Sequence, residues 1–371
     1  MKILMFGHKR IPSREGGVEI VVEALSTRMA ALGHQVTCFN RGGHHVSGAE
    51  FDAQVGGEYR GVRLKTLPTI DKKGLAAVSS SFFGALYSAF SHADVVHIHA
   101  EGPAFMCFLP RLLGKKVVVT VHGLDWQREK WKQGFGAKYI RLGEKMAVRF
   151  ADEIIVLSRN VQAYFRNTYG RETTWIPNGI EKPECLTAEE ITEQFGLEKD
   201  GYLLFLGRLV PEKGIHYLIE AFKAVRTDKK LVIAGGVSDS SEYAESLHKA
   251  AAEDERILFT GFVQGRLLEE LYSNAYAYVQ PSDVEGMPLT LLEAMSYGNC
   301  CMVSDIPECT EVVQDKALTF PKGNTEALRP QLQTLCDQPE TAAQYKNISR
   351  DYICEKFNWD DITEKTLELY R

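Results

Sequence analysis

The sequence predicts an α/β protein with two doubly wound parallel-sheet domains. Short apolar runs alternate with amphipathic segments along almost the whole chain, which is the pattern of repeated strand–helix units. The alternation begins twice, at Lys2–Phe6 and again at Tyr202–Leu206. At 371 residues the chain is long enough for two domains that each bury a sizeable core.

Composition and cysteine usage are those of an ordinary globular protein of the cytoplasm. The chain is 44% hydrophobic and 25% charged, and no apolar run approaches the length that spans a membrane. The apolar run Ile3–Phe6 is too short for a signal peptide and opens directly into a strand–loop–helix pattern. The eight cysteines include no C-x-x-C pair and several lie in apolar runs, so they predict reduced core thiols.

Charge is divided unevenly between the two halves of the chain. Residues 1–180 carry 24 Lys and Arg against 15 Asp and Glu, whereas residues 181–371 carry 19 against 34. A basic first half favours an anionic surface as its partner, such as phospholipid or a lipid diphosphate. An ordinary solvated surface explains the same charges equally well, and no nucleic-acid partner is expected.

The first half opens with a strand–loop–helix–strand unit, which is typical of a doubly wound domain. The strand Lys2–Phe6 leads into a basic loop at 7–17 that ends in Gly16-Gly17, then into a helix and the strand His34–Phe39. The loop lacks G-x-G-x-x-G, so the dinucleotide fingerprint is missing. Its two glycines still allow the helix start to approach a phosphate or a sugar closely.

The middle of the first half is predicted from apolar patterns. Val62–Leu67 is a clear strand, and Ser81–Phe90 is an aromatic-rich helix that either packs in the core or contacts a membrane. The strand Val95–His99 carries His97 and His99, which face the same way as alternate strand residues. Because no third ligand is expected nearby, these histidines do not predict a metal site.

A polar loop follows the next strand, Val117–Val121. His122 and Asp125 lie in this loop, at the carboxyl end of a parallel strand, where such sheets place ligands. His122 suits a sugar hydroxyl, and Asp125 suits orienting His122 or holding an acceptor; a loop histidine bonded to backbone is the alternative. The basic stretch 128–132 suits an interface. A helix to Phe150 and strands Glu153–Leu157 and Thr174–Ile176 complete a first domain of about six parallel strands.

A linker and a second alternating unit come next. The linker contains Pro177 and an acidic run that ends at Asp200. The strand Tyr202–Leu206 then leads into a loop that carries Arg208 and Lys213, five residues apart. Arginine binds phosphate as a planar fork and lysine as a point charge, so the pair suits a diphosphate.

Two further loops offer backbone groups to a ligand. The strand Leu231–Ala234 ends in Gly235 and a second glycine, and the strand Ile257–Thr260 is followed by a turn that reaches Val263. Their N–H and C=O groups are placed to meet a planar base or a ribose at the same sheet edge.

The stretch from Glu285 to Glu293 places two carboxylates around a helix start. It follows an apolar strand that ends at Gln280, and the helix is predicted to begin at Pro288 and to end before Gly298. Two such carboxylates can grip two parts of one ligand through its hydroxyls. Alternatively, Glu285 caps the helix and Glu293 is a solvated helix residue.

These motifs, in this order along the chain, resemble the retaining nucleotide-sugar glycosyltransferases of family 4. Those enzymes have the GT-B fold, in which two Rossmann-like domains face each other across a cleft. The motifs that carry the resemblance are Arg208 and Lys213, Gly235-Gly236, Gly261-Phe262, Glu285 with Glu293, Gly16-Gly17, His122-Gly123 and the segment after Trp359. They cover nearly the whole chain. The loop at 7–17 and the stretch after His122 are also similar to a subgroup associated with bacterial polysaccharide assembly and rhamnosyl transfer.

The resemblance implies a division of the chain and a set of site residues. Residues 1–178 form an acceptor-side domain, residues 179–356 a nucleotide-sugar-binding domain, and residues 357–371 a helix that packs back on the first domain. The implied donor-binding residues are Gly16, Gly17, Arg208, Lys213, Gly235, Val263, Met287, Pro288, Leu289 and Glu293. The implied catalytic residues are His122, Glu285 and Asp125. The family often has Phe-Gly at 287–288, and Pro288 removes one N–H donor there.

The implied reaction moves a hexosyl or deoxyhexosyl group from a nucleotide diphosphate to a hydroxyl of a glycan or a lipid-diphosphate acceptor. The expected role is bacterial surface polysaccharide assembly, in the cytoplasm, with peripheral contact to the inner face of the cell membrane. Arg208, Lys213 and the helix start at Pro288 would stabilise the departing diphosphate. No D-x-D motif occurs, so neither a metal nor a cofactor is expected.

Three other functions fit parts of the pattern. A nucleotide-sugar 2-epimerase would use two similar domains and a similar donor without an acceptor. A dinucleotide oxidoreductase is weakened by the missing glycine fingerprint. A non-catalytic nucleotide-sugar-binding protein is disfavoured because Arg208, Lys213, Glu285 and Glu293 are all present.

Overall fold

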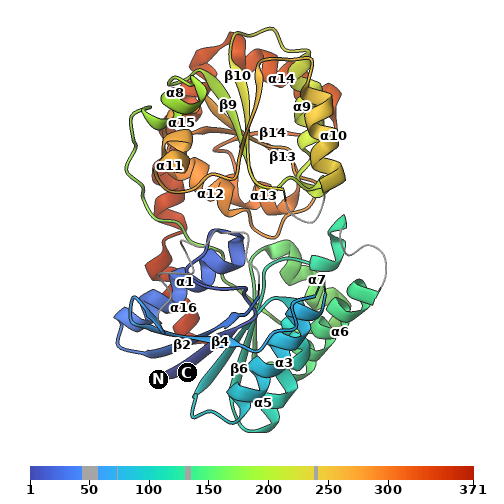
Figure 1. The fold of residues 1–371 in the computed structure, drawn as a ribbon, viewed down its shortest axis with the longest axis vertical. Coiled ribbons are helices and arrows are strands. Elements are labelled where there is room, and N and C mark those ends of the chain that lie inside the picture. Colours follow the sequence, from blue (N-terminus) through green and yellow to red (C-terminus); the bar gives the residue numbers. More distant parts are fainter. Residues whose placement is uncertain (44–56, 73, 130–134, 238–240) are drawn as a thin grey trace. The chain divides into compact units, whose positions relative to one another are not determined.

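The structure is a computed structural model that describes residues 1–371 except 44–56, 73, 130–134 and 238–240. The chain forms two compact units. Unit 1 consists of Met1–Gly179 together with Trp359–Arg371, and unit 2 consists of Ile180–Asn358. Figure 1 shows a sheet in each unit with helices packed on its two sides. The chain is therefore an α/β protein with two doubly wound domains, as the alternation of strands and helices predicts.

The sheet of unit 1 has eight described strands in the order β3-β4-β2-β1-β5-β6-β7-β8. The strands are β1 (Lys2–Phe6), β2 (Gln35–Arg41), β3 (Glu58–Tyr59), β4 (Val62–Leu67), β5 (Val95–His99), β6 (Lys116–Val121), β7 (Glu153–Val156) and β8 (Thr174–Trp175). All pairings are parallel except β3 with β4. Seven of these strands are parallel, close to the predicted number of about six. The antiparallel edge strand β3 was not predicted, because its two residues are too few to show an apolar pattern.

Helices cover both faces of this sheet. They are α1 (Gly17–Ala31), α3 (Leu75–Ala89), α4 (Glu101–Ala104), η1 (Phe105–Cys107), α5 (Phe108–Leu112), η2 (Asp125–Gln127), α6 (Phe135–Phe150), α7 (Arg159–Tyr169) and α16 (Trp359–Glu368). Helix α3 begins six residues before its predicted start, because Gly74 turns the chain at φ +83° and Leu75 follows as a good helix former. Right-handed crossovers put α3, α5 and α6 on the face opposite α1 and α16 (Figure 1).

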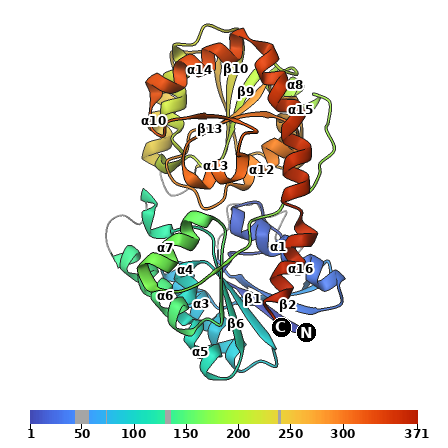
Figure 2. The same cartoon turned by 180° about the vertical axis from the view of Figure 1, so that it is seen from behind.

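The C-terminal segment belongs to unit 1. Helix α16 packs along α1, where Arg28 Nε donates to Asp360 at 2.9 Å, and the two helices lie side by side in Figure 2. Trp359 is buried against Gly179, whose Cα would carry a Cβ only 2.4 Å from the indole ring. Tyr370 reaches the sheet, and its hydroxyl lies 2.6 Å from His97 Nδ1. The last residues are thus fixed to the strand that carries the paired histidines.

The sheet of unit 2 has six described strands, all parallel, in the order β11-β10-β9-β12-β13-β14. The strands are β9 (Tyr202–Leu206), β10 (Lys230–Ala234), β11 (Ile257–Gly261), β12 (Ala277–Gln280), β13 (Cys300–Ser304) and β14 (Leu318–Phe320). The short edge strand β14 was not predicted. The helices are α8 (Glu190–Phe195), η4 (Pro211–Lys213), α9 (Ile215–Lys223), α10 (Ser241–Ala251), α11 (Gly265–Asn274), α12 (Leu289–Ser296), α13 (Pro307–Val313), α14 (Thr325–Asp337) and α15 (Pro339–Lys356).

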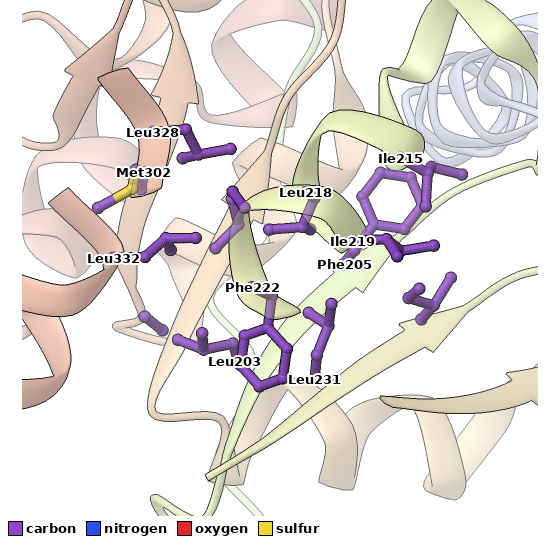
Figure 3. Packing of buried hydrophobic residues seen from close by; sticks show 14 of the residues in the cluster. Leu203, Phe205, Ile215, Leu218, Ile219, Phe222, Leu231, Met302, Leu328 and Leu332 are labelled. Carbon is purple, nitrogen blue, oxygen red and sulfur yellow. The ribbon is translucent and has the colours of Figure 1, made fainter. Parts of the chain in front are cut away.

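The core of unit 2 lies between its sheet and helices α9 and α14. Phe205 on β9 and Phe222 on α9 are fully buried, with Leu218 beside them, as Figure 3 shows. Apolar residues at 215, 218, 219 and 222 give α9 one buried face. Each such side chain contributes about 1.5–3 kcal/mol through burial. This packing fixes the strand ends from which the polar loops of the unit emerge.

Candidate active site

Two loops of unit 2 meet at the carboxyl ends of β9 and β10. Gly207 donates its N–H to Ala234 O at 3.0 Å, and Leu209 donates to Gly236 O at 3.2 Å. A Cβ on Gly235, at φ +154°, would lie 1.8 Å from Gly207 O, so the contact requires glycine there. Arg208 is exposed on the loop that this contact holds in place.

Lys213 is brought to the turn after β12 by a second close contact. It ends η4, and Gly214 follows at φ +65°. A Cβ on Gly214 would lie 2.0 Å from Pro281 O, so only glycine lets η4 approach that turn. The predicted phosphate-binding loop therefore lies against the loop of the central carboxylate.

Glu285 accepts three hydrogen bonds through a single oxygen. Its Oε1 receives Lys213 Nζ at 2.6 Å, Ser282 Oγ at 2.7 Å and Gln280 Nε2 at 2.9 Å. The side chains of Lys213 and Glu285 are only 15% and 8% exposed. Such a pair tolerates burial because further donors satisfy it. Among the residues that the structure describes, every contact of Glu285 uses Oε1, which leaves Oε2 for a ligand hydroxyl.

Gln280 and Ser282 were not predicted as site residues. Tyr278 OH donates to Gln280 Oε1 at 3.0 Å, and this fixes the amide so that its nitrogen faces Glu285. Ser304 Oγ donates to Ser282 O at 2.6 Å and holds the turn. The sequence signal for Gln280 is a polar side chain that ends an apolar strand, and in the structure it is fully buried.

Helix α12 begins one residue later than predicted. Pro288 is the N-cap with extended backbone, and its carbonyl accepts the N–H groups of Leu291 and Leu292. The hydrogen bonds of the Glu285 carboxylate within the described residues come from side chains and not from the N–H groups of α12, so the alternative that Glu285 serves as its cap is wrong. Past the last turn of α12, Gly298 has φ +81°, in agreement with the predicted end.

Glu293 projects from the second turn of α12 toward an aromatic pair. Tyr272 OH donates to Glu293 Oε2 at 2.9 Å, and the Tyr272 ring stacks on Tyr297 with centroids 5.3 Å apart. Burial raises the pKa of Tyr272 well above its usual value, with Glu293 as a smaller cause, so Tyr272 remains a donor. Glu293 is therefore a hydrogen-bonded, half-buried carboxylate rather than a solvated helix residue.

The remaining predicted positions of unit 2 lie on the same sheet edge. Gly235 donates its N–H to Gly261 O at 2.8 Å, which joins the loops after β10 and β11. Val263 is buried just beyond this link, and Met287 is buried ahead of α12. The loops after β9, β10, β11 and β12 thus emerge together, at the edge where parallel sheets bind ligands.

A row of buried histidines lies under the candidate loop of unit 1. His122 Nε2 lies 3.1 Å from His99 Nδ1, and the rings of His99 and His97 are 4.1 Å apart. His97 Nε2 lies 2.7 Å from Thr120 Oγ1. The sequence did not predict that His122 lies beside this pair, and it does so because adjacent strands β5 and β6 bring it to His99. Among the described residues, no group of three or more His, Cys, Asp or Glu is arranged to hold a metal ion.

Burial keeps these imidazoles neutral. It lowers the pKa of His122 and of His97 to about 3 and that of His8 to about 4. The pKa of His99 is also lowered well below its usual value, by burial and then by the neighbouring imidazoles. His122 therefore meets a ligand as a neutral hydrogen-bonding group.

Asp125 is held by groups other than His122. It begins η2, its carboxylate pairs with Arg128 at 3.1 Å, and its N–H donates to Glu101 Oε2 at 2.8 Å. The recorded ring partner of His122 is His99. Of the basic stretch predicted to form an interface, residues 130–132 lie outside the described part of the chain.

The loop at 7–17 lies against the same strand ends. A Cβ on Gly7, at φ +109°, would lie 2.1 Å from His99 O, so glycine is required for this approach. Lys9 donates its N–H to Glu19 Oε1 at 2.9 Å, which ties the loop to the first turn of α1. Gly16 is the extended N-cap of α1, and Gly17 is exposed as its first residue.

All eight cysteines are free thiols. No cysteine forms a disulfide; five are buried, whereas Cys185 is exposed. Within the described ranges, no helix is both long enough and apolar enough to cross a membrane.

The comparisons with known proteins agree with this architecture. Residues 15–182 match the model described as "Glycosyltransferase Family 4", and residues 187–352 match "Glycosyl transferases group 1". The chain resembles α-maltose-1-phosphate synthase of Mycobacterium tuberculosis, with 29% identity over 76% of this chain and 80% of that one. It also resembles the O-antigen chain mannosyltransferase RfbU of Salmonella typhimurium, with 28% identity over 63% and 65% of the two chains.

Solved structures share the fold over the full length. Sucrose-phosphate synthase from Thermosynechococcus elongatus superposes with a TM-score of 0.85 at 23% identity, covering 100% of this chain and 98% of that one. HepE from Anabaena, solved in complex with UDP-glucose, gives 0.80 at 18% identity, covering 99% and 98%. Together with these neighbours, the two Rossmann-like units identify the GT-B fold. The chain belongs to glycosyltransferase family 4.

Proposed function

We propose that this glycosyltransferase moves a hexosyl or deoxyhexosyl group, with retention, from a nucleotide diphosphate to a hydroxyl of a glycan or lipid-diphosphate acceptor. The observation that carries the proposal is the contact of Lys213 with one oxygen of Glu285, which puts a phosphate-binding cation beside a carboxylate with a second oxygen to offer. Two of the similar proteins support this choice of donor and of biological role. One is named an O-antigen chain mannosyltransferase, and HepE was solved with UDP-glucose. We therefore assign the reaction to assembly of a bacterial surface polysaccharide.

Each predicted donor-binding group then has a separate task. Arg208 and Lys213 bind the diphosphate, and the N–H groups at the start of α12 face the sugar and phosphate. Glu285 accepts hydroxyls of the donor sugar through Oε2, and Glu293 accepts the ribose hydroxyls. Backbone beside Gly235 and Val263 meets the base. Gly16 and Gly17 let α1 of unit 1 approach the donor.

The chemistry requires charge to be stabilised on the leaving group. The bond from the sugar C1 to the phosphate oxygen breaks, and an acceptor oxygen bonds to C1 on the same face. The acceptor proton passes to the departing diphosphate. Arg208, Lys213 and the positive end of α12 balance the developing charge without a metal ion. His122, as a neutral imidazole, hydrogen-bonds the donor sugar near C1, and Asp125 serves the acceptor side.

The two carboxylates of the central stretch provide the test. Glu285→Gln should lower turnover strongly and leave the affinity for the free nucleoside diphosphate nearly unchanged, because that ligand has no sugar ring. Glu293→Gln should weaken the free nucleotide by about 1–3 kcal/mol, since a ribose hydroxyl loses a charged acceptor. Glu326→Gln, at an exposed position of α14, is the matched control. Calorimetry with UDP, GDP, ADP and dTDP gives the affinities.

Turnover is measured in EDTA with candidate nucleotide sugars. A requirement for added Mg²⁺ would contradict the assigned charge balance. Loss of stability alone at both positions would remove the proposed roles of the two carboxylates. Conversion of the donor to its epimer with no acceptor present would instead favour a 2-epimerase.

We also propose that unit 1 binds an anionic membrane through the face formed by α3, α5 and α6. Four cations lie on the exposed side of α6, one or two turns apart: Lys138, Arg141, Lys145 and Arg149. Large apolar side chains are exposed on neighbouring elements, including Phe90 at 73% just after α3 and Leu112 at 69% at the end of α5. Basic and apolar groups on one helical layer suit anionic phospholipid, where a lipid-linked acceptor would be held.

A further inference from the structure

Two carboxyl groups meet in the interior of unit 1, below the loop that carries His122. Glu101 begins α4 and is 1% exposed, and Glu144 lies in the middle of α6 and is fully buried. The two helices cross closely because residue 143 is glycine. A Cβ there would lie 2.0 Å from Glu101 O. Helix packing therefore brings the backbones that carry these two side chains close together.

The hydrogen bonds of the two carboxyl groups leave one oxygen of each without a donor. Glu101 Oε2 accepts the Asp125 N–H at 2.8 Å, and Glu144 Oε1 accepts Tyr164 OH at 2.8 Å and also Tyr169 OH. Glu101 Oε1 and Glu144 Oε2 are buried and have no other donor among the described residues. Glu144 is also close enough to Glu101 to raise the pKa of that carboxyl group. A hydrogen bond between the two unsatisfied oxygens would satisfy both, and it requires that one of them carries a proton.

The surroundings favour keeping that proton. The titratable and charged groups on the described elements packed around the pair include His99 on β5, Cys107 on η1, Asp125 and Arg128 at η2, Tyr139 and Arg141 on α6, and Tyr164 and Tyr169 on α7. Both cations are engaged elsewhere, Arg128 with Asp125 and Arg141 over the ring of Trp126. The other cations of α6, Lys138, Lys145 and Arg149, are exposed. Burial, followed by Asp125 and Glu144, raises the pKa of Glu101 well above its usual value.

We propose that Glu101 and Glu144 share one proton and act as positioning residues for the loop 122–125, which Glu101 holds through the Asp125 N–H. The consequence for catalysis rests on the role of His122 proposed above. Loss of the shared proton to solvent leaves two negative charges in contact and breaks the hydrogen bond between them. Glu101 then no longer holds the loop, so kcat falls at high pH while the donor KM, set in unit 2, stays constant.

The shared proton also links stability to pH with a defined sign. A carboxyl group whose folded pKa is raised stabilises the fold fully below its unfolded pKa, near 4.5. That stabilisation is lost as the pH rises through the folded pKa. The alkaline loss of stability should disappear when either member is replaced by an amide, which cannot ionise.

The test compares Glu144→Gln with Glu144→Leu, and uses Glu172→Gln on the exposed surface of unit 1 as the control. Glu144→Gln supplies a permanent N–H donor to Glu101, so we expect near-wild-type kcat at neutral pH and no alkaline fall in kcat or thermal stability up to about pH 9. Glu144→Leu leaves Glu101 without this donor, so kcat should fall at least tenfold at unchanged donor KM. Infrared spectra at neutral pH should show a protonated carboxyl band that Glu101→Gln and Glu144→Gln both remove.

Each outcome bears on a separate claim. If the infrared band is absent, or if Glu144→Gln keeps the alkaline fall of the wild type, the shared proton is refuted. If band and stability behave as expected but kcat of Glu144→Leu stays unchanged, the positioning role is refuted. Failure of the His122 assignment is recognised separately, because His122→Ala would then keep its turnover while the band remained.

Discussion

The two units have the same doubly wound fold but differ in the polar groups at their sheet edges, which are charged in unit 2 and neutral in unit 1. In unit 2 the central groups are ions, with Lys213 and Glu285 paired at 2.6 Å and Arg208 exposed beside them. In unit 1 the central groups are buried imidazoles whose pKa values are strongly lowered, with His122 at about 3. In the proposed roles, cations meet the diphosphate and the neutral imidazole of His122 meets the sugar near its reacting carbon. Glu285 and His122 are equally buried, so the difference between the units lies in the partner of each side chain, a lysine for Glu285 and another imidazole for His122.

Acidification should affect unit 1 far more than unit 2, and this is the largest effect that we expect. The lowered pKa values of His8, His97, His99 and His122 mean that these side chains stabilise the fold fully above about pH 6.5. The stabilisation is lost as the pH falls toward the folded pKa values, at up to about 1.4 kcal/mol per pH unit for each histidine. Hydrogen exchange, corrected for its intrinsic pH dependence, should show β5 and β6 opening first.

A single substitution sharpens this comparison. In His97→Gln, the slope of the opening free energy against pH should decrease by about one proton, or about 1.4 kcal/mol per pH unit, between about pH 5 and 6. His92→Gln, at an exposed position, should leave the slope unchanged. Equal slopes for wild type and His97→Gln would show that His97 is not held neutral.

The sequence was more informative about unit 2 than about unit 1 for a physical reason. In unit 2 the site residues follow successive strands, so Lys213 and Glu285 could be placed at one sheet edge from the strand pattern alone. The two groups that orient Glu285 were not predicted. Gln280 is the last residue of an apolar strand, and Ser282 lies in the turn that follows. Short edge strands such as Leu318–Phe320 gave too little apolar signal.

In unit 1 the informative contacts depend on packing between elements far apart in the chain. Glu101 and Glu144 meet only because Gly143 lets α4 and α6 approach. His99 and His122 meet because β5 and β6 are neighbours in register, with His99 opposite Thr120. No spacing rule within one element reports such contacts, so the contacts between these groups were not predicted.

The membrane face proposed on unit 1 predicts a smaller effect, on the affinity for anionic vesicles. Reversing two charges on α6, with Arg141→Glu and Lys145→Glu together, should weaken binding to anionic vesicles by about 2 kcal/mol or more, at roughly 1 kcal/mol for each cation lost. Arg166→Glu, at an exposed position of α7, is the matched control. Phosphatidylserine and phosphatidylcholine vesicles are compared at low and high salt, because screening should remove the difference. Equal partitioning of wild type onto both lipids at low salt would refute the membrane face.

The central claim is that unit 2 binds the donor and that the His122 loop of unit 1 serves the sugar chemistry. Nucleoside diphosphate affinity and turnover, measured in Arg208→Ala and His122→Ala, test this claim most directly. Calorimetry should show that Arg208→Ala weakens the diphosphate by about 1.5–3 kcal/mol, the scale of a charge-assisted hydrogen bond. His122→Ala should leave that affinity unchanged and lose turnover. Unchanged affinity in Arg208→Ala, or weakened diphosphate binding in His122→Ala, would contradict the assignment of donor binding to unit 2 and sugar chemistry to the loop of unit 1.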